Sequence, residues 1–315
     1  MIASAFVFTG CSKETLKLGL GVCNYYETVT NADGELNGKA TVVSTAAAVL
    51  LDKDNRIVKC EIDCSSNTVE FTSDGKFVKA SDFKTKYELG YDYNMKKYGS
   101  EKEWFEQVDA FESLVKGKTI DEVKALVSTA GKGNTDVVSA GCTIAIEDFA
   151  KAIEKAVNNA VESQATEADT LKIAIATEQT GSDATADKTG YNQIEMSFVA
   201  CVTESATGTV VAITNDSVQT KIAFDTTGTT TTDKANAIST KKELGDSYGM
   251  KSPYGSEKEW YEHSAAFDAT CLGKTAAEIA TLEKADGYGV EALQSAGCTI
   301  AVSGMVKAAV KAATK

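Results

Sequence analysis

The stretches "ELGYDYNMKKYGSEKEWFEQVDAF" (residues 88–111) and "ELGDSYGMKSPYGSEKEWYEHSAAF" (residues 243–267) are two versions of one sequence. Their spacing grows from 155 residues at the start of the match to 156 at Trp104 and Trp260, so one residue is inserted near Pro253. A repeat of this length far exceeds a solenoid unit, and each copy is long enough to form a domain with its own core. The sequence therefore predicts a duplication into two tandem homologous domains.

The boundaries of the two copies come from looser matches outside these stretches. "LKLGLGV" at Leu16 corresponds to "LKIAIAT" at Leu171, and a polar segment precedes the second of these. We predict a leader and tether over residues 1–14, a first domain over 15–162, a linker over 163–169 and a second domain over 170–315.

Within each copy the predicted strands come first and the helices last. The strand segments are rich in apolar and β-branched residues, and the following helical segment (100–115) repeats its apolar residues every three or four positions. Strands followed by helices predict an α+β fold, in which each domain packs an antiparallel sheet with helices. The predicted strands are 39–52, 55–63 and 67–71 in the first copy and 196–205, 208–216 and 220–224 in the second. The predicted apolar helix face consists of Trp104, Val108, Phe111 and Val115.

The charge balance argues against one class of partner. The chain of 315 residues has 32 Lys and Arg against 45 Asp and Glu, a net charge of −13. Nucleic-acid binding needs clustered basic side chains, so no nucleic-acid partner is expected. The chain has a single histidine, His263, and the corresponding residue of the first copy is Gln107. We therefore predict that His263 is an ordinary polar helix residue and that no catalytic histidine exists.

The cysteines do not predict a metal site or a local disulfide. The sequence has eight cysteines but no CxxC pair, so the usual zinc and thioredoxin spacings are absent. Cys60 and Cys64 lie on a predicted strand, where four residues span about 13 Å. A disulfide needs Cα atoms within about 7 Å. We interpret both as apolar core residues.

The N-terminal segment "MIASAFVFTGCSKE" is apolar and ends in small residues before Cys11. It resembles the end of a bacterial lipoprotein signal peptide, with "FTGC" as the lipobox and Cys11 as the lipidated residue. The apolar part is shorter than the roughly 20 residues of a membrane-spanning helix. The alternatives are a mis-assigned start and an ordinary buried strand.

The "GKT" of both copies is not a phosphate-binding loop, because the first glycine of that motif is missing. It predicts a helix-capping box instead, formed by Thr119 with Glu122 and by Thr275 with Glu278.

The identical "GSEKEW" segments predict a second pair of helix starts. Ser100 and Ser256 are the expected N-caps, with Glu103 and Glu259 three residues later. The two tryptophans that follow are expected in the core, and the alternative is that they flank an aromatic ligand.

The segment "SAGCT" occurs at residues 139–143 and 295–299, and a helical pattern follows it each time. Small residues allow a close backbone approach, and the free N–H groups of a helix start attract anions such as phosphate. The alternative is tight packing of the turn against the sheet, with the threonine as N-cap. The candidate binding residues are Ser139, Gly141, Cys142 and Thr143 in the first copy and Ser295, Gly297, Cys298 and Thr299 in the second.

Taken together, the two-copy layout, "ELGDSYGM", "EKEWYEH", "GKT" and "SAGCTI" resemble bacterial FMN-binding-domain lipoproteins, relatives of the flavin-bearing subunits of sodium-pumping and Rnf-type electron-transfer complexes. The resemblance implies FMN joined through a phosphoester to a threonine and installed by a flavin transferase. The matching acceptors are Thr143 and Thr299. The family motif approximates Asp-x-x-Ser/Thr-Gly-Ala-Thr; here Cys replaces Ala, and only the first copy has a nearby aspartate, Asp136. Thr143 is therefore the expected acceptor, ahead of Thr299.

The function implied by this resemblance is that of an electron carrier rather than a stand-alone enzyme. We expect a lipid-anchored flavoprotein on the outer face of the bacterial cytoplasmic membrane that exchanges electrons with redox partner proteins. No residue needs to act as a catalytic acid or base, because the flavin carries the redox chemistry. The alternative hypothesis is a flavin-free surface lipoprotein that binds a ligand or a protein partner on the same scaffold.

Overall fold

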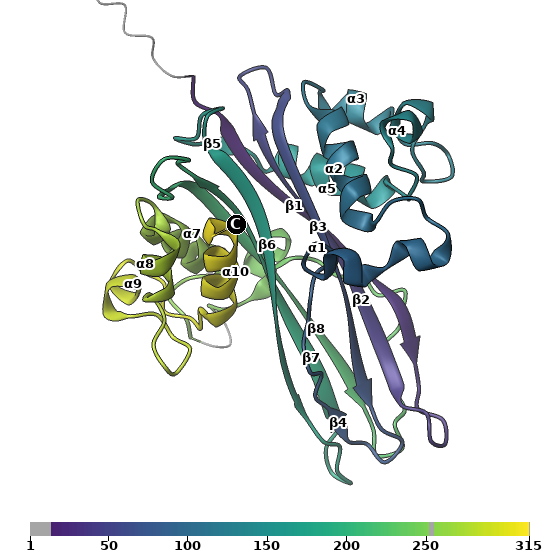
Figure 1. Ribbon diagram of the computed structural model, residues 1–315. Coiled ribbons are helices and arrows are strands. Elements are labelled where there is room, and N and C mark those ends of the chain that lie inside the picture. The colour runs from purple at the N-terminus through teal and green to yellow at the C-terminus, as the bar shows by residue number, and fades with distance from the viewer. Residues whose placement is uncertain (1–13, 252–254, 315) are drawn as a thin grey trace, which may run out of the picture.

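Two antiparallel sheets form the centre of the molecule, as Figure 1 shows. The computed structural model describes residues 14–251 and 255–314. The first sheet has the strand order β4-β3-β2-β1-β5 and the second the order β6-β7-β8. The first sheet consists of β1 (Lys17–Thr30), β2 (Gly38–Leu51), β3 (Ile57–Phe71), β4 (Phe77–Val78) and β5 (Val161–Glu162), and the second of β6 (Thr170–Ser182), β7 (Gly190–Thr203) and β8 (Val210–Phe224). The predicted α+β fold with antiparallel sheets is confirmed.

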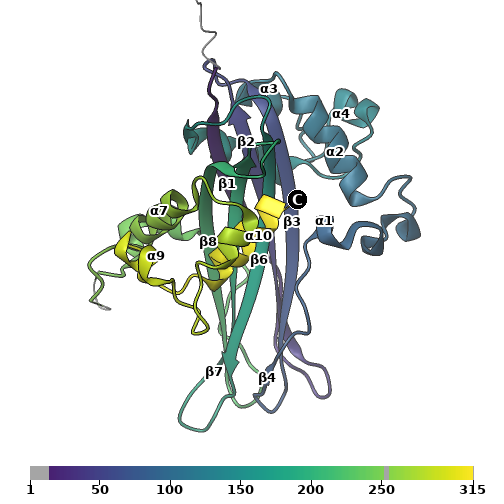
Figure 2. The same cartoon turned by 60° about the vertical axis from the view of Figure 1, so that its left-hand side comes forward.

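Helices cover the outer face of each sheet, so the molecule has four layers (Figure 2). In the first repeat these are α1 (Lys86–Leu89), α2 (Trp104–Val115), α3 (Ile120–Lys124), α4 (Thr135–Ala140) and α5 (Glu147–Asn158), with 3₁₀ turns at Gly90–Tyr93 and Met95–Tyr98. In the second they are α6 (Lys241–Leu244), α7 (Trp260–Cys271), α8 (Ala276–Ala280), α9 (Glu291–Ser295) and α10 (Ser303–Thr314), with a 3₁₀ turn at Gly245–Tyr248.

The inner faces of the two sheets pack on each other and form one core, which we call the shared core. Leu18 of β1 and Val42 of β2 belong to the same buried cluster as Ile173 of β6. Near the far ends of the strands the rings of Phe71 and Phe224 stack with centroids 4.7 Å apart. The expectation that each copy has its own core is therefore incomplete, because half of each sheet is buried by the other copy.

Each repeat also has an outer core between its sheet and its helices. The predicted apolar face of α2 lies there, with Trp104, Val108, Phe111 and Val115 all buried. Trp260 and Phe267 take the corresponding places on α7. Cys60 and Cys64 are buried in the first outer core as free thiols, as the sequence predicts.

The strand β2 has its predicted length, but β3, β7 and β8 are longer than predicted. One continuous strand, β3, covers residues 57–71, where the sequence predicts two strands separated near Cys64. The polar residues Ser65, Ser66 and Asn67 do not end it, because they pair with Ser44, Val43 and Val42 of β2. The hydrogen bonds between paired strands satisfy the backbone N–H and C=O groups whatever the side chains are.

Two reciprocal ion pairs join the repeats. Lys155 on α5 lies 2.5 Å from Glu243 on α6, and Lys311 on α10 lies 2.7 Å from Glu88 on α1. These two pairs occupy corresponding places, so the repeats are related by an approximate two-fold axis. The predicted linker, residues 163–169, connects β5 to β6, and its Ala165 is buried in the shared core.

Candidate functional site

The first "SAGCT" segment ends a helix, contrary to the sequence prediction that it begins one. Ser139 is in the last turn of α4, and Gly141 follows that helix in the left-handed conformation, with φ of 101°. The N–H of Cys142 donates to the carbonyl of Val137 at 3.1 Å, which closes the helix end. Helix α5 begins only at Glu147. The negative end of the α4 dipole therefore lies at this turn and does not favour an anion.

The second segment has the same geometry. Ser295 ends α9, Gly297 has φ of 103°, and the N–H of Cys298 donates to the carbonyl of Leu293 at 3.1 Å. Helix α10 begins at Ser303.

Four of the predicted binding residues are not placed to hold a ligand together. The side chains of Cys142 and Cys298 are fully buried in the outer cores, and burial raises the pKa of each thiol to about 11. Ser139 and Ser295 are exposed at the ends of short helices.

Gln107 connects the first turn to the start of α2. Its Oε1 accepts from the N–H of Thr143 at 2.8 Å and lies 3.0 Å from the Thr143 hydroxyl. Its Nε2 donates to the Ser100 hydroxyl and the Lys102 carbonyl, both at 3.2 Å. The predicted N-cap at Ser100 is wrong, because Glu103 caps α2 and forms the capping box with its third helical residue.

His263 takes the place of Gln107 in the second repeat and is only 2% exposed. Its Nδ1 lies 2.9 Å from the Gly297 carbonyl oxygen and 3.3 Å from the Thr299 nitrogen, and its Nε2 lies 3.2 Å from the Ser256 hydroxyl. Here too the predicted N-cap, Ser256, is replaced by a glutamate, Glu259. His263 therefore holds the turn that carries Thr299, a role that the sequence prediction of an ordinary polar residue missed.

A lysine lies over the glycine of each turn. A Cβ on Gly141 would come 2.2 Å from Nζ of Lys102, and one on Gly297 would come 2.0 Å from Nζ of Lys258. Lys258 Nζ donates to the Gly297 carbonyl at 3.4 Å, and within the described part of the chain it makes no ion pair. The ammonium group is therefore available to an anion that binds at this turn.

A cavity of about 740 Å³ adjoins the second turn. The exposed Thr299 contributes to its wall, together with Gly297, Lys258 and His263. Tyr288, 45% exposed, also lines it, and Lys132 occupies the corresponding position in the first repeat. Of the predicted residues, the structure thus brings together Gly297 and Thr299. The sequence prediction missed Lys258 and His263 as residues of this site. A signal for them was present, because Lys258 lies in the identical "GSEKEW" segment and His263 lies three residues after it.

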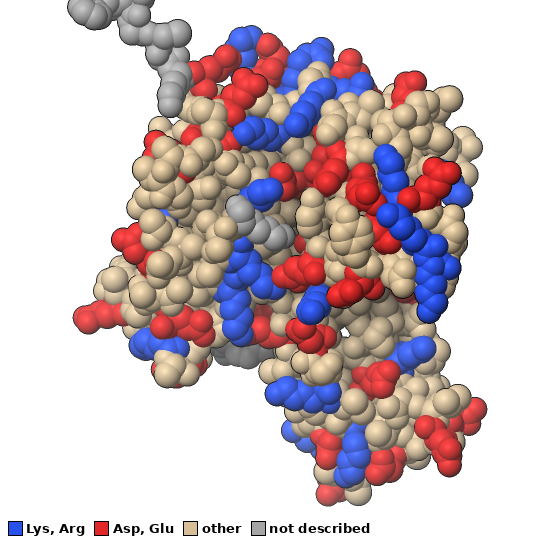
Figure 3. Space-filling view, viewed as in Figure 1, with Lys and Arg blue, Asp and Glu red and all other residues tan. Residues whose placement is uncertain are grey.

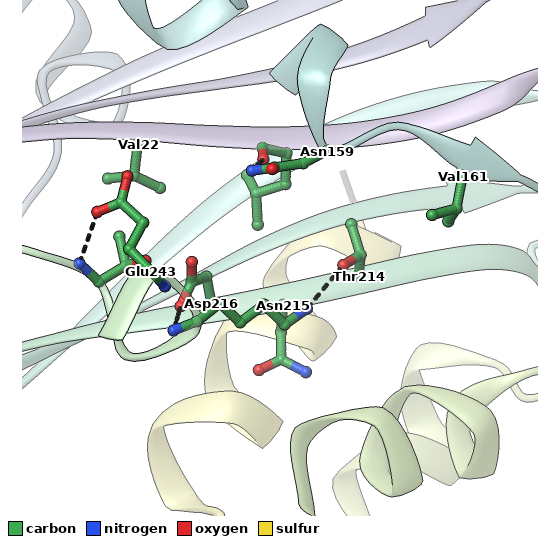
Figure 4. Close-up of a pocket in the computed structure, with 10 residues that line it drawn as sticks. Val22, Asn159, Val161, Thr214, Asn215, Asp216 and Glu243 are labelled. Carbon is green, nitrogen blue, oxygen red and sulfur yellow. Dashed lines mark hydrogen bonds between the residues drawn. The ribbon is translucent and has the colours of Figure 1, made fainter. Parts of the chain in front are cut away.

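A second cavity, of about 360 Å³, lies between the repeats where β1 approaches β8 (Figure 4). Asp216 lines it, and its Oδ1 accepts from the backbone N–H groups of Ser217 and Lys242 at 2.7 and 3.1 Å. Burial raises the pKa of Asp216. Behind it Asp268 accepts from the Asn215 side chain at 2.7 Å, and burial raises its pKa to about 6. Asp216 and Asp268 thus accept the backbone N–H groups of Ser217 and Asn215 on the edge strand β8.

The described residues give no sign of a metal centre or a membrane span. No group of three or more His, Cys, Asp and Glu side chains among them is arranged to hold a metal ion. None of their helices combines the length and the apolar character needed to cross a bilayer. Figure 3 shows basic and acidic side chains interspersed over the face viewed there.

No family model, curated protein or solved structure matches this chain.

Proposed function

We propose that this protein is an extracytoplasmic, lipid-anchored electron carrier that holds FMN in the cavity beside Thr299. The observation that carries the proposal is the exposed residue Thr299 on the wall of a 740 Å³ cavity. This volume lies within the range of about 300–1,000 Å³ that is usual for small-molecule sites.

The residues of the cavity fit a flavin nucleotide. The Lys258 ammonium, which has no ion pair among the described residues, supplies the positive charge for the phosphate that the helix end does not supply. The half-exposed ring of Tyr288 offers a face for an aromatic ring system. When bound, FMN supplies the electron-transfer chemistry, and the protein supplies attachment and surroundings.

Thr299 is the preferred attachment residue, although the motif spacing favours Thr143. Both threonines are exposed, but the Thr143 hydroxyl is engaged by Gln107 at 3.0 Å. Thr299 lines the same cavity as Lys258 and Tyr288. In this proposal a flavin transferase moves the FMN group from a flavin dinucleotide to the Thr299 oxygen, which loses its proton, and the nucleotide monophosphate leaves; Thr143 is modified less or not at all.

The membrane tether and the partners belong to the same proposal. Cys11, the predicted lipidation residue, lies outside the described residues. Lipidation there would place the protein on the outer face of the cytoplasmic membrane, beside redox partner proteins. A single acyl chain gives only reversible membrane binding, so more than one chain would be needed for a stable anchor.

One observation favours the second candidate, a flavin-free surface lipoprotein that binds a ligand or a partner. Both "SAGCT" turns lie at helix carboxyl ends, where the dipole disfavours a phosphate. The glycine, the buried cysteine and the lysine of each turn are all explained by packing alone.

Production of the protein together with a flavin transferase distinguishes the two candidates. We expect a yellow protein whose intact mass includes one FMN group, and whose adduct is lost in Thr299→Ala but kept in Thr299→Ser and Thr143→Ala. Lys258→Met should lower the modified fraction. A colourless protein of unmodified mass would support the flavin-free candidate, and loss of the adduct only in Thr143→Ala would contradict the assignment to Thr299.

A further inference from the structure

The approximate two-fold axis gives the molecule two corresponding seams between its sheets. At one seam β3 of the first sheet meets β6 of the second, and at the other β1 meets β8. Because the two copies match in sequence, most residues of these strands in one seam have a counterpart in the other. The two seams are nevertheless packed very differently.

The β3–β6 seam is filled at the position of Tyr87. Glu61 of β3 pairs with Lys172 of β6 at 3.4 Å across it. Tyr87, the second residue of α1, lines the same place, and its hydroxyl donates to Asp109 at 2.7 Å. The hollow that remains between these groups is only about 20 Å³.

At the β1–β8 seam both of these groups are replaced. Thr214 stands where Glu61 stands, and Lys242 stands where Tyr87 stands. A seam that lacks the phenol ring and the ion pair leaves the cavity of about 360 Å³. The cavity opens to solvent beside the exposed Val161, so a small molecule can enter it.

The two walls of this seam cavity differ in character. On the β1 side lie the apolar side chains of Leu20 and Val22, and Val161, 62% exposed, stands at the mouth. Figure 4 shows Val22, Asn159 and Val161 on this side and Thr214, Asp216 and Glu243 on the facing side. The facing wall therefore offers hydrogen-bonding groups opposite an apolar surface.

The charged groups of the lining already have partners. Glu243 pairs with Lys155 at 2.5 Å. Lys242 Nζ donates to Thr214 Oγ1 at 3.1 Å and lies 4.0 Å from the buried Asp268. Asp216 accepts two backbone N–H groups. An ionic ligand would lose its hydration without gaining an unpaired counter-charge.

We propose that the β1–β8 seam cavity binds a small uncharged amphiphile, with an amide or hydroxyl group toward Thr214 and Lys242 and a short hydrocarbon part against Leu20 and Val22. The site is separate from the cavity beside Thr299 and does not depend on flavin. A neutral polar group can share the hydrogen bonds of the lining without breaking an ion pair.

Three probes of nearly equal size test this proposal: butyramide, butyrate and butylammonium. Each is titrated into protein with labelled methyl groups, and the methyl resonances are followed by NMR. We expect butyramide to shift the resonances of Leu20, Val22 and Val161 saturably, with the two ions binding at least about tenfold more weakly. The absence of a saturable shift with butyramide, or tighter binding of either ion, would overturn the proposal.

Two variants complete the test. Lys242→Tyr gives the β1–β8 seam the ring that Tyr87 supplies at the other seam and should abolish the butyramide shifts. Thr299→Ala should leave them unchanged, which separates this site from the proposed flavin site. The comparison of the three probes on the unaltered protein remains decisive if Lys242→Tyr does not fold.

Discussion

At the residue scale, the sulfur of Met196 is the acceptor of a polar cluster in the middle of the shared core. The hydroxyls of Ser44 and Ser65 each lie 3.5 Å from it, and Nδ2 of Asn67 lies 3.2 Å from it. All four residues are buried, so no bulk water replaces a lost contact. A buried donor without an acceptor costs about 1–3 kcal/mol.

Met196→Leu should therefore destabilise the protein by about 1–2 kcal/mol, because the Ser65 hydroxyl then has no acceptor among the described residues. Methionine and leucine are otherwise exchangeable in cores. The control is Met305→Leu, at a buried position in the apolar outer core of the second repeat. Urea unfolding measures both variants, and equal losses would show that the sulfur is not an acceptor of consequence.

A second residue-scale feature is the buried carboxyl group of Glu112 on α2. Its Oε1 accepts the N–H of Ile62 at 2.6 Å and so joins α2 to the edge of β3. Burial and, after it, the charges of Glu61 and Asp109 raise its pKa to about 9, although the hydrogen bond from Ile62 and the charge of Lys172 lower it. The folded state therefore holds this group protonated at pH 7–8, whereas the unfolded chain ionises it near its ordinary pKa.

The pH dependence follows from this difference. Between the unfolded pKa and the raised folded pKa the folded state binds more protons, so this group makes stability fall as pH rises through that window. Glu112→Gln should remove the slope and exceed the wild type by at least about 1 kcal/mol at pH 8, with the advantage shrinking toward pH 5. Urea unfolding across this range checks it. Parallel stability curves for the two proteins would contradict the raised pKa.

At the element scale, the repeated small-residue segment is a helix stop. Glycine takes the left-handed position, cysteine fills the core just after it, and a lysine lies on the bare Cα. Small residues beside a helical pattern fit a helix start and a helix stop equally well by composition. Only the short helix before the segment decides between them, and its six residues carry little periodicity of their own.

Gly297→Ala should destabilise the protein by about 1–3 kcal/mol, since its φ of 103° strains any residue with a Cβ. Gly141→Ala, at φ of 101°, should cost a similar amount. Thermal and urea unfolding measure both variants. The neighbouring Ala296→Gly, in the ordinary helical region, is the control with a smaller effect. A negligible loss at both glycines would contradict the assigned turn.

Other elements were predictable because their signals are local. The capping boxes of Thr119 and Thr275 form as expected, with both reciprocal hydrogen bonds present. The caps predicted at Ser100 and Ser256 were wrong, because a glutamate nearer to the helix provides the cap. Sequence spacing shows which residues are able to cap, and the backbone path between them decides which one does.

At the scale of the whole molecule, the duplication was predictable and the shared core was not. Alternation along a strand shows which faces are buried, but not which sheet buries them. One signal was available in β2, where residues 40–51 include no charged residue and every one of them is buried. A strand without a polar face is covered on both sides. The Thr299 cavity and the seam cavity were equally hidden, because each depends on residues far apart in the chain.

The central structural claim is that the two repeats unfold as one body because they share this core. The chain has one tryptophan in each repeat, Trp104 and Trp260, so the variants Trp260→Phe and Trp104→Phe report on the first and second repeat separately. The most direct measurement adds Phe267→Ala, in the outer core of the second repeat, and follows the fluorescence of Trp104 during urea unfolding. The account predicts that the Trp104 transition moves to lower urea by as much as the transition of the whole chain seen by circular dichroism. If the Trp104 transition stayed at the same urea concentration, the two repeats would be independent domains, and the claim of a shared core that unfolds as one body would be contradicted.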